Sequence, residues 1–380
     1  VQMKKAGILF FLLVYCFFFT ITAKAEQEYT EEMITQQIDK LHLYDIDEQI
    51  EKIWQKQELP SFGECIKKSI LEGKGIDIAD LLTILYRKLA GEITTQIAMV
   101  KKMLFIILLS AILKNINQSF YNKSVGELGF YVCYMVLIVV ITATFYSQTD
   151  MVHDAIKNVE IFFKAMMPVF MTLSFASGGY GEFSLTAPAI ITGAAILTNI
   201  VCYGILPAIV MATSLEMINN ISEKPMLNHF TKLLQEGIGW SMKGTAFLFI
   251  ALLSLQKLGG NIFNQGLGKT AKAVVTSIPI VGDVMGGAVD TAAALTGMIR
   301  GGTLFATIIF LALFCAVPLI KLAIMILIYK VTAAVSEPIC ESRIIKCINA
   351  AGDFSVLLFG ALFLVECMFL FSAVLLLTFF

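Results

Sequence analysis

Four ionisable residues stand within or beside long apolar stretches of this chain: Asp283, Asp290, Lys321 and Glu366. An unpaired charge in the middle of a bilayer costs at least about 2.5–3.5 kcal/mol on insertion scales, so such groups usually pair or face water. Two hypotheses follow. All four residues could build a polar cavity or ion path, or Lys321 and Glu366 could form a structural ion pair that fixes helix packing.

The two aspartates lie in a segment, residues 269–302, that is rich in glycine (Gly286 and Gly287 among them) and contains Pro279. Asp283 and Asp290 are seven residues apart, which places them on one face if residues 283–300 form a helix. Lipid offers no hydrogen bonds to irregular backbone and no partners to the aspartate carboxylates. We therefore expect a segment buried in protein or lining a polar passage, packed against the span that contains Lys321. An interfacial amphipathic helix with a glycine-packed back face is the alternative.

Known catalytic and cofactor patterns are incomplete here. The stretch Gly266-Leu-Gly268-Lys269-Thr270 resembles the end of a phosphate-binding loop, but Phe263 occupies the position of its leading glycine. Ile280-Val-Gly282-Asp283 lacks the first glycine of the G-x-G-D element of intramembrane aspartyl proteases, which weakens a hydrolase built on Asp283 and Asp290. Cys340 and Cys347 have no histidine nearby, which argues against zinc. We expect a protein that is not an enzyme and that has no cofactor or metal.

The composition indicates what must position these residues. Hydrophobic residues make up 57% of the chain, charged residues make up 15%, and the mean hydropathy is +0.79. Several stretches approach the roughly 20 apolar residues that a membrane-crossing helix needs. The sequence therefore predicts an all-α, polytopic helical membrane protein. A net charge of -1 gives no basic field for nucleic acid.

The N-terminal part predicts export. Lys4 and Lys5 precede an apolar run from Ala6 to Thr20 and a small-residue site at Ala23-Lys24-Ala25, which together indicate a signal peptide at residues 1–25. Residues 26–98 then predict a small extracytoplasmic domain of amphipathic helices, in which Ser61 caps a helix that continues through Leu71. This domain could dock onto partner proteins or form a modest bundle of its own.

The membrane region divides into three expected parts. Residues 99–150 hold a first pair of transmembrane helices, at about 97–116 and 126–146, and residues 147–164 have the pattern of an interfacial helix. Two tandem repeats follow, at 151–259 and 260–380. The prolines that mark them are Pro168 and Pro207 in the first copy and Pro279 and Pro318 in the second, with the same 39-residue separation and an offset of 111. We expect these prolines, with Gly286 and Gly287, to be positions of helix breaks or close helix packing. A repeat of three spans makes the copies inverted, and a repeat of two spans makes them parallel.

Several short motifs, in their order along the chain, resemble the stage III sporulation protein AE family. They are Tyr131-Val-Cys-Tyr134-Met135-Val136-Leu137-Ile138, Ser177-Gly178-Gly179, Ile278-Pro279-Ile280-Val281-Gly282, Asp290-Thr291, Pro318-Leu-Ile-Lys321 and Tyr329-Lys330 through Pro338.

The resemblance implies a subunit of the multi-protein complex that spans the space between mother cell and engulfed forespore. The protein would sit in the mother-cell membrane with its N-terminal domain in that space, and would help to form a channel or secretion-like apparatus with other subunits. The residues alone leave an alternative from another class, an autonomous secondary transporter with a polar site between the repeats. Neither reading names a small-molecule substrate.

Overall fold

The computed structural model describes residues 43–54, 61–71, 101–109, 123–176, 180–220, 226–264 and 282–378, together with single positions at 38, 41, 83, 86, 111 and 112. From residue 180 onward, side chains are described only at 187–220, 226–254 and 296–377. The expected signal peptide and Pro279 lie outside the described residues, and so do both ends of the expected first transmembrane helix.

The described part of the chain is helical and contains no strand. Its elements are α3 (Tyr44–Trp54), α4 (Phe62–Leu71), α6 (Lys123–Ala165), α7 (Met167–Ala176), α8 (Tyr180–Ile200), the π-helix η1 (Val201–Ile205), α9 (Leu206–Asn219), α10 (Asn228–Asn264), α12 (Gly282–Ser336) and α13 (Ser342–Thr378). Among the described residues, five helical segments are long and apolar enough to cross a membrane. The predicted all-α polytopic membrane fold is confirmed.

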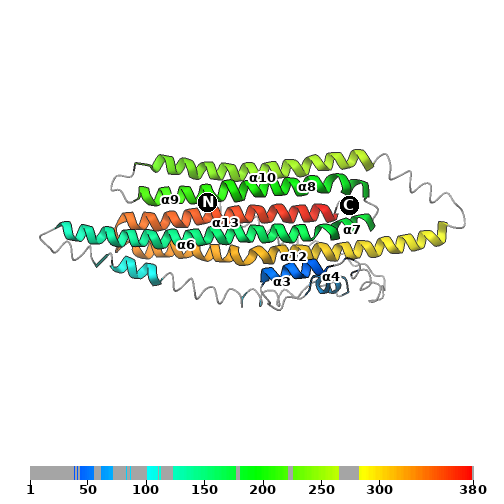
Figure 1. The fold of residues 1–380 in the computed structure, drawn as a ribbon, viewed down its shortest axis with the longest axis horizontal. Helices are drawn as coiled ribbons and strands as arrows, with labels where there is room; N and C mark the ends of the chain where they lie inside the picture. The colour runs from blue at the N-terminus through cyan, green and yellow to red at the C-terminus, as the bar shows by residue number, and fades with distance from the viewer. Residues whose placement is uncertain are drawn as a thin grey trace.

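The long helices lie side by side along one axis (Figure 1). α6, α10 and α13 run one way along this axis, and α8–α9 and α12 run the opposite way (Figure 1). The helix pair α8–α9 and α10 therefore has the same directions as the pair α12 and α13. This arrangement fits the version of the repeat in which each copy contributes two spans and the copies are parallel. The repeat itself stays a prediction.

α12 is a single helix of 55 residues with Pro318 inside it. The glycine-rich segment and the span that contains Lys321 are therefore parts of one helix, and the expected packing of one against the other is wrong. The break expected at Pro318 is also not seen. A proline can stay within a membrane helix when neighbouring helices and local adjustments satisfy the freed carbonyl. At 1.5 Å per residue α12 is about 83 Å long.

α6 continues through residues 147–164, where the sequence predicted a separate interfacial helix. Its buried positions there include Val152, Ile156, Val159 and Phe163, each at most 1% exposed. The amphipathic pattern is confirmed, but the apolar face is covered by other helices of the bundle instead of entering a membrane surface. The domain boundary expected at residue 150 falls inside this helix.

Two of the marker prolines lie where the helical backbone changes. Pro168 follows the turn at Met166 that separates α6 from α7. Pro207 follows η1, in which the Leu206 N–H bonds to the Val201 carbonyl five residues earlier. Proline lacks an N–H and its ring crowds the carbonyl four residues before it, here that of Tyr203. The wider π-turn accommodates this loss.

α4 begins as the sequence predicted. The Ser61 Oγ accepts a hydrogen bond from the Glu64 N–H at 3.1 Å, and the Glu64 carboxylate accepts one from the Ser61 N–H at 3.3 Å. This reciprocal pair is a capping box. α4 then packs on α12, with the fully buried Phe62 ring 5.6 Å from that of Phe310 and 6.2 Å from that of Phe162 in α6. Its apolar face is covered by the membrane helices of its own chain.

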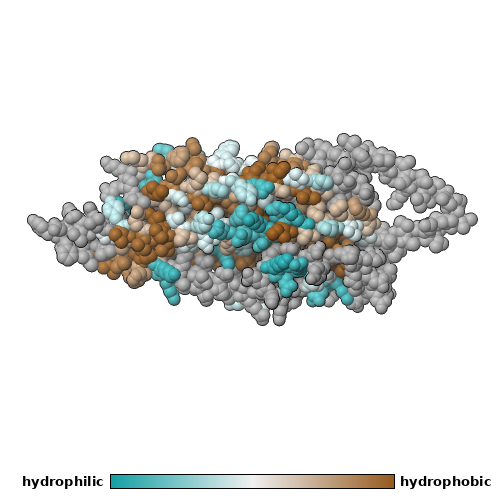
Figure 2. Space-filling view, viewed as in Figure 1, coloured by the Kyte–Doolittle hydropathy of each residue, from teal (hydrophilic) through white to brown (hydrophobic). Residues whose placement is uncertain are grey.

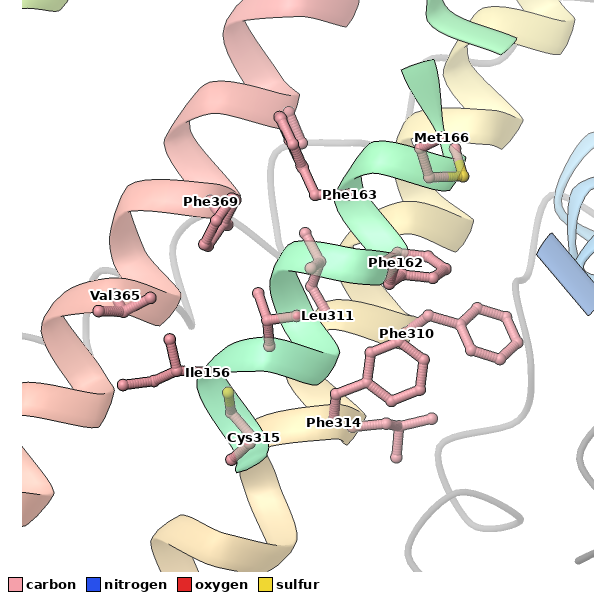
Figure 3. Close-up of a cluster of buried hydrophobic side chains, with 14 of the residues drawn as sticks. Ile156, Phe162, Phe163, Met166, Phe310, Leu311, Phe314, Cys315, Val365 and Phe369 are labelled. Carbon is pink, nitrogen blue, oxygen red and sulfur yellow. The ribbon is translucent and has the colours of Figure 1, made fainter. Parts of the chain in front are cut away.

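The core is richest in aromatic side chains where α6, α12 and α13 meet (Figure 3). The Phe162 ring lies 4.9 Å from that of Phe314, and the Phe163 ring lies 5.1 Å from that of Phe369. Aromatic contacts of this kind add about 0.5–1.5 kcal/mol each beyond the burial of their area. This junction holds the three helices in one register.

Candidate functional site: a buried carboxyl between α12 and α13

Glu366 of α13 is enclosed in the interior of the bundle. The residue is 4% exposed, and neither carboxyl oxygen has a hydrogen-bond partner. The Cys315 thiol of α12 lies next to the carboxyl without reaching hydrogen-bond geometry. Figure 3 shows Cys315 with Ile156 and Val365 in the space between the three helices. The burial that the sequence suggested for Glu366 is present, and the groups that interact with it are the thiols of Cys315 and Cys367.

The ion pair expected between Lys321 and Glu366 is not formed: both carboxyl oxygens of Glu366 lack a partner. The geometry of α12 explains why. Cys315 faces Glu366 across the interface, and Lys321 lies six residues further along α12. Six residues correspond to about 9 Å along the axis and about 240° around it, so the lysine leaves from another face of the helix. Lys321 is only partly buried there.

Other polar groups follow the α12/α13 interface. At one end, the Arg300 Nε donates to the carbonyl of Leu377 in the last turn of α13. The hydroxyls of Thr303, Thr307 and Ser372 are fully buried, and each donates to the carbonyl four residues before it. At the far end, Lys330 of α12 forms an ion pair with Asp353 of α13 at 2.7 Å. The interface is thus polar at both ends and along its length, with Glu366 between them.

A second buried polar group was missed by sequence reasoning. The Gln148 amide of α6 donates to the Tyr329 hydroxyl of α12 at 3.3 Å and accepts from the Ser355 hydroxyl of α13 at 2.9 Å. All three residues are at most 5% exposed. Each polar atom is satisfied across a helix boundary, so this network ties the three helices together. A lone glutamine between Ser147 and Thr149 gave no sequence signal for it.

The structure describes no contact between Glu366 and the remaining predicted site residues. The backbone at Asp283, Gly286, Gly287 and Asp290 is helical, as part of α12, but their side-chain surroundings lie outside the described residues. The sequence hypothesis that the two aspartates and Glu366 share a cavity therefore stays a prediction. Among the described residues, no three histidine, cysteine, aspartate or glutamate side chains form a group that could hold a metal ion.

Outside the membrane spans, the carboxyl of Asp47 is half-buried and the thiol of Cys65 is buried. Burial raises the pKa of Asp47 above its usual value, and the hydrogen bond that its Oδ1 accepts from the Phe62 N–H at 2.7 Å partly offsets this. Burial likewise raises the pKa of Cys65 to about 12. Asp47 links α3 to the first turn of α4, and Cys65 lies on the face of α4 that packs on the bundle.

The geometry limits what the site can do chemically. A single carboxyl enclosed by apolar side chains can hold a proton or fix the packing of two helices. Nucleophilic catalysis would need a nucleophile and a base within hydrogen-bond reach, held by a third group. Around Glu366 the described side chains do not form such an arrangement.

Comparison with known proteins gives the family. The model of the family described as stage III sporulation protein AE matches residues 60–379. Stage III sporulation protein AE of Bacillus subtilis (strain 168) is 22% identical over 324 residues, which cover 83% of this chain and 80% of that protein. No solved structure matches. Because the family match covers most of the chain, the protein belongs to the stage III sporulation protein AE family.

Proposed function

We propose that this chain is a non-enzymatic, polytopic membrane subunit of a sporulation channel or secretion-like complex that links mother cell and forespore. It would lie in the mother-cell membrane, with residues 26–98 on the outer side, and would assemble with other subunits of that complex. Membership of the sporulation family and the five candidate membrane spans support this role.

Within that family, the burial of Glu366 inside the bundle supports a subunit over a transporter. The carboxyl of Glu366 is buried beside the thiol of Cys315, and neither of its oxygens has a hydrogen-bond partner. A transporter that works alone needs a polar site that its substrate can reach between moving elements. Here the charged side chains of the described residues are mostly at the outer surface, where a neighbouring subunit can use them.

The test is to isolate the full chain, with an affinity tag, from sporulating cells of its own source under mild cross-linking. We expect other membrane subunits to co-purify in fixed ratios and a strain without the protein to arrest before spores mature. The purified chain alone should give no substrate-coupled ion flux in proteoliposomes. A chain that purifies alone and drives such flux would overturn the proposal in favour of an autonomous secondary transporter.

A further inference from the structure

Among the acidic and basic side chains in the described part of the chain, Glu366 alone is buried. The others lie at least partly on the outer surface, and Figure 2 shows hydrophilic residues gathered over the middle of the bundle. Both carboxyl oxygens of Glu366 lack a hydrogen-bond partner. An ionised carboxylate loses several kcal/mol of hydration in such a place, and a carboxyl group that keeps its proton avoids most of this cost. Glu366 therefore needs either a cation or a proton.

The two groups that interact with Glu366 are thiols. They belong to Cys315 on α12 and to Cys367 on its own helix. A neutral thiol is a weak donor and offers no positive charge. Lys321 leaves α12 from another face, as described above. Neither α12 nor α13 thus places a cation against this carboxyl.

α6 brings no unpaired cation to the same level. Phe163 meets Phe369 of α13, so Glu366 is level with Glu160 of the parallel helix α6. Glu160 is itself acidic and forms an ion pair with Lys164 of its own helix at 2.6 Å. The nearest lysine of α6 is therefore already paired.

The other helices that pack on α13 also lack a cation here. Residues 167–176, 187–200 and 206–219 contain no lysine, arginine or histidine, and the same holds for residues 244–254 of α10. Lys243, which precedes the last of these ranges, is exposed on the outside of α10. The acidic and thiol groups of these helices lie elsewhere: the Cys202 thiol interacts with Glu160, and Glu216 interacts with Cys347. Within the described part of the chain, the ligand left for Glu366 is a proton.

α12 lacks a backbone hydrogen bond close to this carboxyl. Pro318 has no N–H, so the carbonyl of Phe314 loses the donor that a helix provides four residues further on. Phe314 immediately precedes Cys315, whose thiol interacts with Glu366. A water molecule that enters here has two O–H groups and can donate one to the carboxylate and one to the Phe314 carbonyl. This lowers the cost of admitting water to an ionised Glu366.

We propose that Glu366 is a proton-binding site that controls the contact between α12 and α13. With the proton bound, the neutral carboxyl stays enclosed and the two helices stay packed. When the proton passes to water, the carboxylate draws water into the interface, and α12 bends away from α13 at Pro318.

The opening is confined to the middle of the interface. At one end Arg300 donates to the Leu377 carbonyl, and at the other end Lys330 is paired with Asp353. Neither contact involves Glu366, so both persist when the proton leaves. The expected change is therefore a local exposure of the interface around Cys315.

The protonation state is tested first, on the full-length chain in nanodiscs at pH 6. Infrared difference spectra between the wild type and Glu366→Gln should show the C=O band of a protonated carboxyl in the wild type alone. Loss of carboxylate bands in its place would overturn the inference, because Glu366 would then be ionised in the closed bundle.

The opening is tested by alkylation of Cys315, which is 1% exposed, with the membrane-permeant reagent N-ethylmaleimide followed by peptide mass spectrometry. Every thiol reacts faster as pH rises, so each wild-type rate is divided by the rate for Glu366→Gln at the same pH. This ratio should be about one at pH 6. Towards pH 9.5 it should rise by up to about tenfold per pH unit, since one proton is released on opening.

Two variants and a second thiol serve as controls. Glu366→Asp keeps a carboxyl that can release a proton, and Glu216→Gln removes a carboxyl far from Glu366, so both should retain the rise at Cys315. The buried Cys347 should show no rise. A Cys315 ratio that stays constant from pH 6 to pH 9.5 would overturn the inference, and so would an equal rise at Cys347, which would mean that the whole bundle opens.

The inference goes beyond the proposed function and does not depend on it, because both measurements use the chain alone. A chain that co-purifies with other sporulation subunits but shows no proton-dependent exposure of Cys315 loses only the proton site. A chain that shows this exposure but purifies without other subunits and is dispensable for sporulation loses only the proposed function.

Discussion

Gly302 of α12 lies directly against Ile66 of α4. A Cβ atom added to Gly302 would come within 3.3 Å of the Ile66 carbonyl oxygen and 3.0 Å of the Ile70 Cγ1. A Cβ added to Gly301 would meet nothing within 4 Å. The missing side chain at Gly302 is therefore what lets α4 lie close to α12, and the adjacent glycine provides a matched control.

We expect Gly302→Leu to push α4 away from the bundle, while Gly301→Leu leaves it in place. Cys65 reports the change, because it is 1% exposed and its pKa of about 12 keeps the thiol neutral and unreactive. Alkylation of Cys65 at pH 8, followed by peptide mass spectrometry, should be at least about tenfold faster in Gly302→Leu. Equal rates in the two variants would show that α4 does not depend on this contact.

The contact between α3 and α4 should depend on pH through Asp47. Burial raises the pKa of Asp47 in the folded state above the value of 3.8 that applies when it is exposed. The folded state then binds the proton more tightly, so this contribution to stability is complete below pH 3.8 and is lost as pH rises through the raised pKa. Between pH 3.5 and pH 7, the melting temperature of the wild type should fall relative to that of Asp47→Asn. A wild-type melting temperature that keeps a constant distance from that of Asp47→Asn, or that rises relative to it with pH, would contradict the assignment.

Removal of the Gln148 side chain should loosen three helices at once. Gln148→Ala leaves the Tyr329 hydroxyl without its donor and Ser355 without one acceptor, which typically costs about 1–3 kcal/mol for buried groups. Thr149→Ala is the control, because that hydroxyl bonds only to the Phe145 carbonyl of its own helix. Thermal unfolding in nanodiscs should separate the two variants. Equal melting temperatures would mean that the network adds nothing.

Replacement of Glu366 by an apolar residue should stabilise the bundle. Both carboxyl oxygens are buried without a partner, and an apolar side chain of similar size removes that unfavourable burial. We expect Glu366→Leu to raise the melting temperature in nanodiscs above that of the wild type. Glu366→Gln, which keeps a buried polar group, should gain less. A lower melting temperature in Glu366→Leu would show that the carboxyl has a stabilising partner in the protein.

Local features of the fold were predictable because their causes lie within a few residues. The capping box follows from Ser61 and Glu64 three positions apart. The apolar spacing on α6 identified its buried face, although the partner of that face did not follow from the pattern. The distorted backbone before Pro207 follows from the missing N–H of proline.

Features that depend on register between distant segments were not predictable. The Gln148 network joins residues 181 and 207 positions apart in sequence. The Lys321–Glu366 pair failed for the same reason, since the sequence places both residues in neighbouring spans but does not give the axial offset between α12 and α13. That offset is set by packing of the aromatic residues of three helices, such as Phe163 against Phe369.

The uninterrupted length of α12 has a mechanical consequence. A rod of about 83 Å is far longer than the hydrocarbon core of about 30 Å, so it reaches well beyond the bilayer. An α-helix is stiff over this distance compared with a loop. Gly282 and Ser336 are therefore joined without an intervening loop, so a displacement of one end of α12 is coupled to the other end.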